Sequence, residues 1–411
     1  MARLEWFFDV ICPQTYLAAG RIEGLAREAG HELVLRPISL ARLYAAQGLP
    51  EQPEQDWPEN KRRRQHHDVL RQAELAGLQL RGPLTRPPDE SEAAQRLLAG
   101  APEQQRAGLM HALLRAAWDE GRTLDDPGLL QQLAAEHNTD PTAMDSSAAL
   151  QALEQTTEKA LERGVFGVPT AIAGEQLWWG ADRLDFLARA IGATPSSNAH
   201  QPDGQTRRLE VFHDFSSPFS YLACTQVERL AREHSAELVW RPMLLGALFR
   251  SIGTPMVPIQ AMSPNRQRWG RRDMAQWAEH WGVPLQFISH FPLNTVLALR
   301  VSAVEPDLIQ PLYRAAWAKD RNLSDPATVE AIIREAGMDP EDVVARATSD
   351  ANKAVIKTNT AAAESLGACG APTLVVNGSL VFWGQDRLDM VGKALDGWVP
   401  AVDAEAPTDT H

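Results

Sequence analysis

The chain has 411 residues, and its 53 acidic side chains outnumber the 40 basic ones to give a formal charge of −13. General nucleic-acid binding needs a basic face, so nucleic acid is not an expected partner. No apolar run approaches the roughly 20 residues of a membrane span, and the first residues lack the basic and apolar regions of a signal peptide. The spacing of the three cysteines, Cys12, Cys224 and Cys369, matches no motif of paired cysteines. Such sparse cysteine usage fits a reducing cytoplasm, where we expect the protein to work without contact to a membrane.

The two halves of the chain are near-copies of each other. The segment 4–18 (LEWFFDVICPQTYLA) returns as 209–223 (LEVFHDFSSPFSYLA), and 179–185 (WGADRLD) returns as 383–389 (WGQDRLD). So long a period indicates two whole domains rather than a solenoid, whose repeats are about 20–50 residues. We predict domains at 1–193 and 207–399, a polar linker at 194–206, and a disordered tail at 400–411.

Each copy predicts the same order of elements. The first copy opens with a buried aromatic strand, continues with a helix over Tyr16–Ala29, and returns to a strand at Leu33–Leu35. A long helical middle follows, from about 60 to 163, and includes a helix with Pro127 in its first turn. A strand at Thr170–Ala173, a turn, a last strand and a helix from Asp182 complete the copy. In the second copy the corresponding strand is expected at Thr373–Val376 and the final helix from Asp386. Each copy is therefore predicted to be an α/β domain in which a βαβ unit is followed by a helical insert and then by a ββα unit.

The first candidate site is the turn between the opening strand and its helix. Cys12 and Ser217 occupy the same position in the two copies, each directly before a proline. The free N–H groups and positive potential of a helix N-terminus stabilise a thiolate, either the protein's own or that of a ligand. A serine hydroxyl there can donate a hydrogen bond to the sulfur of a ligand. Simple helix capping explains the same pattern and stays open at this point.

The second candidate site is an X-Pro bond before a strand, where proline is otherwise disfavoured. It occurs as Val168-Pro169 and as Ala371-Pro372. A cis peptide here would leave the backbone of the preceding residue free to pair with a peptide ligand, whereas an ordinary trans proline is the alternative. No Cys or His stands at metal-ligand spacing from the adjacent pair His66-His67 in the sequence, so no metal site is predicted.

Together these elements resemble the thioredoxin superfamily, and specifically its DsbA-like branch with a helical insertion. The segment 214–223 (DFSSPFSYLA) is similar to the opening signature of 2-hydroxychromene-2-carboxylate isomerases and kappa-class glutathione transferases. The segments 165–170 (VFGVPT) and 178–184 (WWGADRL) resemble the closing signature of the isomerases, and 291–295 (FPLNT) resembles their middle motif. The resemblance covers both copies and implies two tandem thioredoxin-like domains, each with a helical insertion.

The resemblance also implies roles for individual residues. Ser217 would hold the thiolate of glutathione, the implied cofactor, and Cys12 takes this position in the first copy. Residues implied to bind the cofactor are Ala371, Pro372, Gln385 and Asp386 in the second copy, and Val168, Pro169 and Asp182 in the first. Residues implied to line the substrate side are Asn265, Arg266 and Asn294, with Asn60 and Lys61 from the first copy. Family members are homodimers, so the two domains are expected to form a pseudo-dimer within one chain.

Three functions remain open. The leading hypothesis is a glutathione-dependent isomerase or transferase acting on a small aromatic or electrophilic compound through Ser217. The alternative is a thiol–disulfide oxidoreductase working through Cys12, although Thr15 stands where such enzymes carry a second cysteine. The third hypothesis is a non-catalytic binding protein in which neither site is active. An inert first domain is compatible with each of the three hypotheses.

Overall fold

The computed structural model describes residues 1–196 and 203–404. By contacts the chain separates into two compact units. Unit 1 comprises Met1–Asp56, His66–Ser197 and Ser263–Arg266, and unit 2 comprises Trp57–Gln65, Asn198–Met262 and Gln267–His411. Of the predicted linker, residues 197–202 lie outside the described residues. Of the predicted tail, Ala401–Ala404 form the short helix α18, and residues 405–411 lie outside the described part of the chain.

Unit 1 is built on a four-stranded mixed sheet in the order β2-β1-β3-β4. Strand β1 (Arg3–Phe8) pairs in parallel with β2 (Glu32–Pro37) and antiparallel with β3 (Thr170–Ala173), which pairs with β4 (Gln176–Trp179). The predicted β-α-β start and the strand at Thr170–Ala173 are therefore confirmed. The helices of the first copy are α1 (Pro13–Glu28), α2 (Leu40–Ala46), α3 (Glu59–Leu75), α4 (Glu92–Gly100), α5 (Glu103–Trp118), α6 (Pro127–Glu136), α7 (Ser147–Glu162) and α8 (Leu184–Ile191).

Unit 2 repeats this architecture with the order β6-β5-β7-β8. Its strands are β5 (Arg208–His213), β6 (Glu237–Pro242), β7 (Thr373–Val376) and β8 (Leu380–Trp383), with the same parallel and antiparallel pairings. The helices of the second copy are α9 (Pro218–Glu233), α10 (Leu245–Ile252), α11 (Pro264–His280), α12 (Val296–Val304), α13 (Ile309–Trp317), α14 (Pro326–Glu335), α15 (Pro340–Ala347), α16 (Asp350–Ser365) and α17 (Leu388–Leu395). The α/β fold with two helical inserts is thus confirmed.

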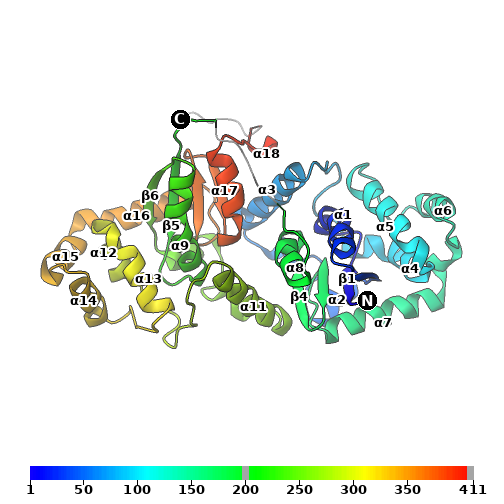
Figure 1. Cartoon of the computed structure of the whole chain (residues 1–411), viewed down its shortest axis with the longest axis horizontal. Helices are drawn as coiled ribbons and strands as arrows, with labels where there is room; N and C mark the ends of the chain where they lie inside the picture. Colours follow the sequence, from blue (N-terminus) through cyan, green and yellow to red (C-terminus); the bar gives the residue numbers. More distant parts are fainter. Residues whose placement is uncertain (197–202, 405–411) are drawn as a thin grey trace. The chain divides into compact units, whose positions relative to one another are not determined.

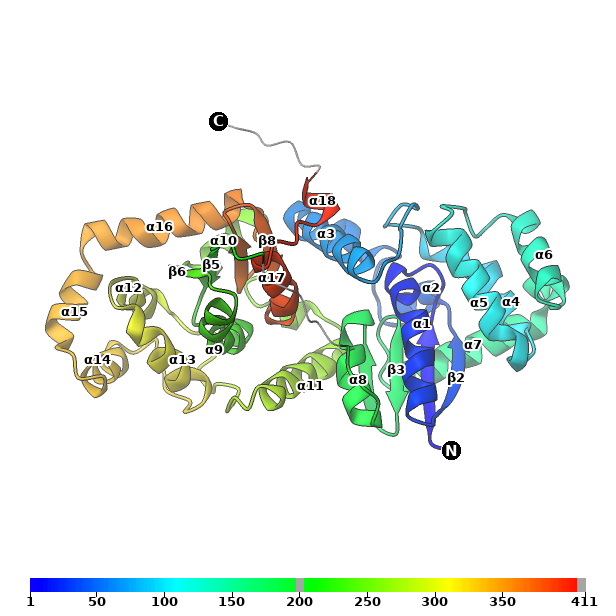
Figure 2. The same ribbon diagram turned by 45° about the horizontal axis from the view of Figure 1, so that its top comes forward.

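The helical inserts form by ordinary capping rules. Asp126 and Asp325 cap α6 and α14 by accepting a hydrogen bond from an N–H in the first turn, and a proline follows each of them. Helices α12 to α15 lie together to one side of the sheet of unit 2, as Figures 1 and 2 both show. Within the described helices, none is long and apolar enough to span a membrane.

One buried tryptophan joins the insert to the sheet in each unit. Trp118 donates its indole N–H to the carbonyl oxygen of Val10 at 2.9 Å, and Trp317 donates to Phe215 at 2.8 Å. Both rings are buried in the cores of their units. Because Val10 and Phe215 lie two residues before Cys12 and Ser217, these bonds fix the turns that carry Cys12 and Ser217.

Candidate functional site

In unit 2, Ser217 caps the N-terminus of α9. Its Oγ accepts a hydrogen bond from the N–H of Ser220 at 3.1 Å and donates to the carbonyl oxygen of Ala371 at 2.8 Å. The Ala371–Pro372 peptide is cis, and the Pro372 carbonyl accepts the N–H of Gly384 at 3.1 Å. The structure therefore brings Ser217 against Ala371, two of the residues expected to meet glutathione.

Gly384 lies directly after β8 and two residues before Asp386. Gly384 has φ +107°, a conformation that L side chains rarely adopt, and a Cβ there would overlap Oδ1 of Asp386. Gln385 is buried, and the Asp386 carboxylate pairs with Arg387 at 3.1 Å. Gln385–Arg387 form the single turn η7, so the helix expected from Asp386 begins at Leu388. The same shift in unit 1 moves the helix expected from Asp182 to Leu184, after the turn η4 (Ala181–Arg183).

In unit 1, Cys12 occupies the same place but makes weaker contacts. It caps α1 without a side-chain hydrogen bond to the helix, and its Sγ lies 3.3 Å from the carbonyl oxygen of Val168. Burial raises the pKa of the Cys12 thiol to about 11, although the N–H groups of Thr15 and Gln14 act in the opposite direction. The thiol is therefore protonated at neutral pH.

A second difference concerns the turn that follows β4. The Val168–Pro169 peptide is cis, and the Pro169 carbonyl accepts the N–H of Gly180 at 2.9 Å, as in unit 2. Asp182 pairs with Arg183 at 2.8 Å, as Asp386 pairs with Arg387. The difference is that the side-chain oxygen of Gln14 accepts the N–H of Ala181 at 3.3 Å. Phe219 stands in the place of Gln14 in unit 2.

A buried aspartate supports each turn, a role that the sequence alone did not suggest. Asp214 accepts hydrogen bonds from the N–H of Ser216 at 2.9 Å, the hydroxyl of Thr295 at 2.7 Å and the N–H of Leu245 at 2.8 Å. Burial raises the pKa of Asp214. One carboxylate thus ties the Ser217 turn to the start of α10 and to the insert. The signal was available, because an aspartate occupies this position in both copies.

Asp9 does the same in unit 1. It accepts hydrogen bonds from the N–H of Ile11 at 3.1 Å, the hydroxyl of Ser91 at 2.7 Å and the N–H of Leu40 at 2.9 Å. Burial raises the pKa of Asp9 to about 6 against these bonds, which favour the ionised form. A buried aspartate therefore holds the Cys12 turn through the same three kinds of hydrogen bond as the Ser217 turn. The two turns differ in the side chain that they carry, a thiol in unit 1 and a hydroxyl in unit 2.

The residues predicted to line the substrate side are divided between the units. The Asn265 amide donates to the carbonyl oxygen of Leu161 at 3.2 Å, and the Arg266 guanidinium lies 5.5 Å from the centre of the Trp179 ring; contacts group both residues with unit 1. Contacts group Asn60 and Lys61 with unit 2, where the Lys61 ammonium lies 3.9 Å from the centre of the Trp57 ring. Their roles toward a substrate stay predictions.

Asn294 lies in the loop before α12. Its N–H donates to the Ser324 hydroxyl at 2.8 Å, and its side-chain oxygen accepts the N–H of Val296 at 3.3 Å. In unit 1, Glu90 takes this place and accepts hydrogen bonds from the N–H of Leu124 at 3.0 Å and from Arg86 at 2.7 Å. Asn294 thus secures the insert loop in this structure, and a role toward substrate stays a prediction.

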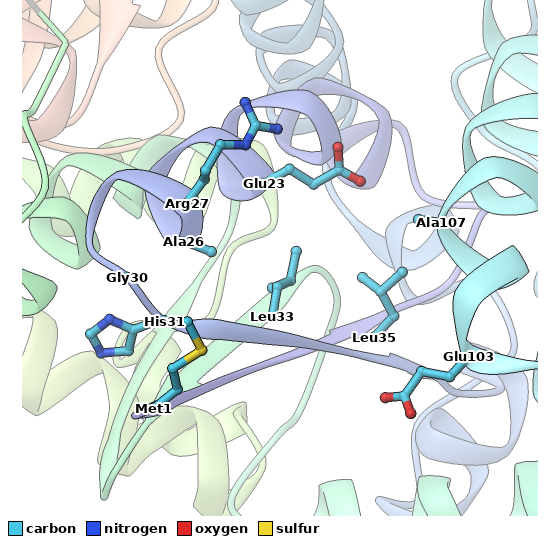
Figure 3. A pocket seen from close by; sticks show the side chains of 10 residues that line it. All are labelled: Met1, Glu23, Ala26, Arg27, Gly30, His31, Leu33, Leu35, Glu103 and Ala107. Carbon is cyan, nitrogen blue, oxygen red and sulfur yellow. The ribbon is translucent and has the colours of Figure 1, made fainter.

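One cavity of about 490 Å³ lies elsewhere on unit 1 (Figure 3). Leu33 and Leu35 of β2 form its apolar floor, and Glu23 and Arg27 of α1 and Glu103 of α5 stand around it. It lies along the second half of α1, whereas Cys12 caps the first turn. The cavity is therefore separate from Cys12.

Comparison with known proteins agrees with this geometry. The model of the DSBA-like thioredoxin domain matches residues 3–192 and again 208–396. The chain belongs to this family and carries its domain twice.

Similar proteins within the family are enzymes. A 2-hydroxychromene-2-carboxylate isomerase of Pseudomonas putida is 32% identical over 208 residues, covering 48% of this chain and 97% of the relative. Glutathione S-transferase kappa 1 of Rattus norvegicus is 25% identical over 216 residues, covering 48% and 94%. A solved structure of 2-hydroxychromene-2-carboxylate isomerase covers 46% of this chain and 94% of its own, with 29% identity and a TM-score of 0.40.

Proposed function

We propose that the protein is a glutathione-dependent isomerase or transferase whose reaction takes place in unit 2. The observation that carries this proposal is the Ser217 hydroxyl, which caps α9 and donates to the Ala371 carbonyl at 2.8 Å. Ser217 is 4% exposed, so its hydroxyl is surrounded by protein rather than by water. A hydroxyl that donates to a carbonyl oxygen can instead donate to a thiolate, and the N-terminus of the helix favours that negative charge.

The residues around Ser217 fit the remainder of glutathione. The backbone of Ala371 next to the cis peptide would pair with the tripeptide, and Gln385 would lie beside it. The Asp386 carboxylate, which pairs with Arg387 at 3.1 Å, would in addition accept the ammonium group of the γ-glutamyl end. These assignments are supported by the relatives, which include glutathione transferases.

The chemistry follows from a thiolate held in this way. It attacks an electrophilic carbon of a conjugated substrate, a C–S bond forms, and the electron pair of the double bond moves onto the conjugated carbonyl. The former double bond is now single and rotates. Expulsion of the thiolate breaks the C–S bond and restores the double bond, so isomerisation regenerates glutathione. A reaction that ends after attack and protonation is a transfer.

The oxidoreductase alternative through Cys12 receives less support. A nucleophilic thiol must ionise near neutral pH, whereas burial raises the pKa of Cys12 to about 11. In addition, Gln14 already bonds the Ala181 N–H at the turn where the end of a peptide ligand would bind. Both features favour unit 2 as the active one.

The test measures the ionisation of bound glutathione. Calorimetry at neutral pH in two buffers of different ionisation enthalpy gives both the affinity and the protons released, and we expect wild type to release protons. A charge-assisted hydrogen bond contributes about 1.5–3 kcal/mol, so S217A should raise the pKa of the bound thiol by about 1–2 units. The matched variant C12A should change neither quantity. Proton release that is lost in C12A and kept in S217A would overturn the proposal.

A further inference from the structure

Arg266 is a positive charge that contacts group with unit 1. Its guanidinium lies 5.5 Å from the centre of the Trp179 ring. No carboxylate of the described residues pairs with it, although the side chain is only partly exposed. Burial lowers the pKa of Arg266, as expected for a cation that has lost part of its water without gaining an anion. A negatively charged ligand stabilises such a group.

The segment that begins α11 is fixed to unit 1 by hydrogen bonds. The Ser263 hydroxyl donates to the side-chain oxygen of Gln47 at 2.8 Å, and the Asn265 amide donates to the Leu161 carbonyl at 3.2 Å. The amide nitrogen of Gln47 in turn donates to the Phe166 carbonyl at 3.2 Å. The segment therefore lies against the loop that precedes the cis peptide of unit 1.

The same loop connects Arg266 to the Cys12 turn. The Trp179 ring, on which the guanidinium lies, packs against the Phe166 ring with 4.9 Å between centroids. Two residues further along the chain, the carbonyl oxygen of Val168 lies 3.3 Å from the Sγ of Cys12. Arg266 and Cys12 therefore border the same loop.

Tyr44, on α2, lies within electrostatic range of both groups. Burial raises the pKa of its hydroxyl, the Cys12 thiol raises it further, and Arg266 lowers it. A tyrosine hydroxyl that stays protonated can donate a hydrogen bond to an anion. Phe249 stands at this position in unit 2, so only unit 1 has a hydroxyl here.

We propose that unit 1 binds a carboxylate-bearing ligand, whose carboxylate pairs with the Arg266 guanidinium and whose other end lies at the Cys12 turn. A single guanidinium matches the one charge of a carboxylate better than the roughly 1.5 to 2 charges of a phosphate. The resemblance implied that Arg266 serves the substrate side of the second copy, whereas its contacts give this cation to the Cys12 site. The inference concerns unit 1 and does not depend on the proposed function.

The test compares two alkylating reagents at Cys12 in the full chain. Iodoacetate carries a carboxylate and iodoacetamide is neutral, so the ratio of their rates measures the attraction of an anion to the Cys12 turn. Both rates are read by mass spectrometry of the peptide that contains Cys12, at low ionic strength, where screening is weak. The ratio in wild type should exceed that in R266Q by about threefold to tenfold, while the iodoacetamide rate stays the same.

Two further variants separate charge from structure. R266K keeps the positive charge and should keep most of the wild-type ratio. The matched control is R271Q, which removes an exposed charge from the same helix and should leave the ratio unchanged. A ratio that is the same in wild type and R266Q, or that falls as far in R271Q as in R266Q, overturns the anion site. A loop merely loosened by R266Q would accelerate both reagents alike and keep the wild-type ratio, which also overturns it.

Discussion

The buried carboxylate of Asp9 makes the stability of unit 1 depend on pH in a predictable direction. Its pKa is about 6 in the folded protein against 3.8 for an ordinary aspartate. Below pH 3.8 the group is protonated in both states, and its stabilising contribution is fully present. As pH rises to 6, the unfolded chain ionises first, and this contribution is lost. At about 1.36 kcal/mol per pKa unit, the loss amounts to about 3 kcal/mol.

The perturbation is D9N, which has nearly the same shape but does not titrate. The variant loses part of the hydrogen bonding to Ile11, Leu40 and Ser91, and this penalty is independent of pH. We therefore expect the difference in unfolding free energy, wild type minus D9N, to fall by about 2.4 kcal/mol between pH 4 and pH 7, because the unfolded chain is already partly ionised at pH 4. The two units need not unfold together, so the assay is urea-dependent hydrogen exchange read on peptides from β1 and β2.

A second variant checks the cause. S91A removes the hydroxyl that donates to Asp9 at 2.7 Å, and this bond favours the ionised carboxylate. The pKa of Asp9 should therefore rise in S91A, and the loss of stability should extend to higher pH. A wild-type-minus-D9N difference that stays constant from pH 4 to pH 7 would show that the three hydrogen bonds offset burial completely, and would refute the reasoning.

Three further predictions concern the sites. Alkylation of Cys12 by iodoacetamide should accelerate with pH toward its pKa of about 11, and a rate that levels off below pH 8 would contradict the burial argument. G384A should strain the backbone by about 1–3 kcal/mol and displace Asp386. Calorimetry should therefore show a glutathione affinity at least tenfold lower than that of wild type. An unchanged affinity would count against a role of this turn in glutathione binding. R86A should destabilise unit 1 by about 1.5–3 kcal/mol, because it removes the buried Arg86 guanidinium that donates to the partly buried Glu90 carboxylate. Urea unfolding within 1 kcal/mol of wild type would refute the importance of this pair.

Much of the fold was predictable because local signals and the repeat agreed. The strands at Thr170–Ala173 and Thr373–Val376 lie where their apolar runs predicted, and Asp-Pro pairs marked the starts of α6 and α14. The helices expected from Asp182 and Asp386 begin two residues later, because a single 3₁₀ turn precedes each of them. Hydrophobic periodicity does not distinguish such a turn from the first turn of an α-helix.

The candidate sites were predictable only in part. Cys12 and Ser217 follow from the matched turns, and the structure places each beside the carbonyl oxygen of the residue before its cis proline. The hydrogen bond between Gln14 and the Ala181 N–H was not predictable, because no local pattern states which way such a side chain points. It became visible only when the two units could be compared bond by bond.

The Gln14 side chain in unit 1 has a consequence for any ligand of that unit. Because its side-chain oxygen accepts the Ala181 N–H, Gln14 competes with any ligand that would accept the same N–H. Such a group works at a fixed, high effective concentration that dilution does not lower. A ligand needing the Ala181 N–H binds only the fraction of molecules in which Gln14 has moved away, so its apparent affinity falls by that fraction. Unit 2 has Phe219 at this position, and a phenyl ring cannot accept such a hydrogen bond. The duplication has therefore produced two copies of the turn that differ in whether a side chain of the same unit competes for the N–H.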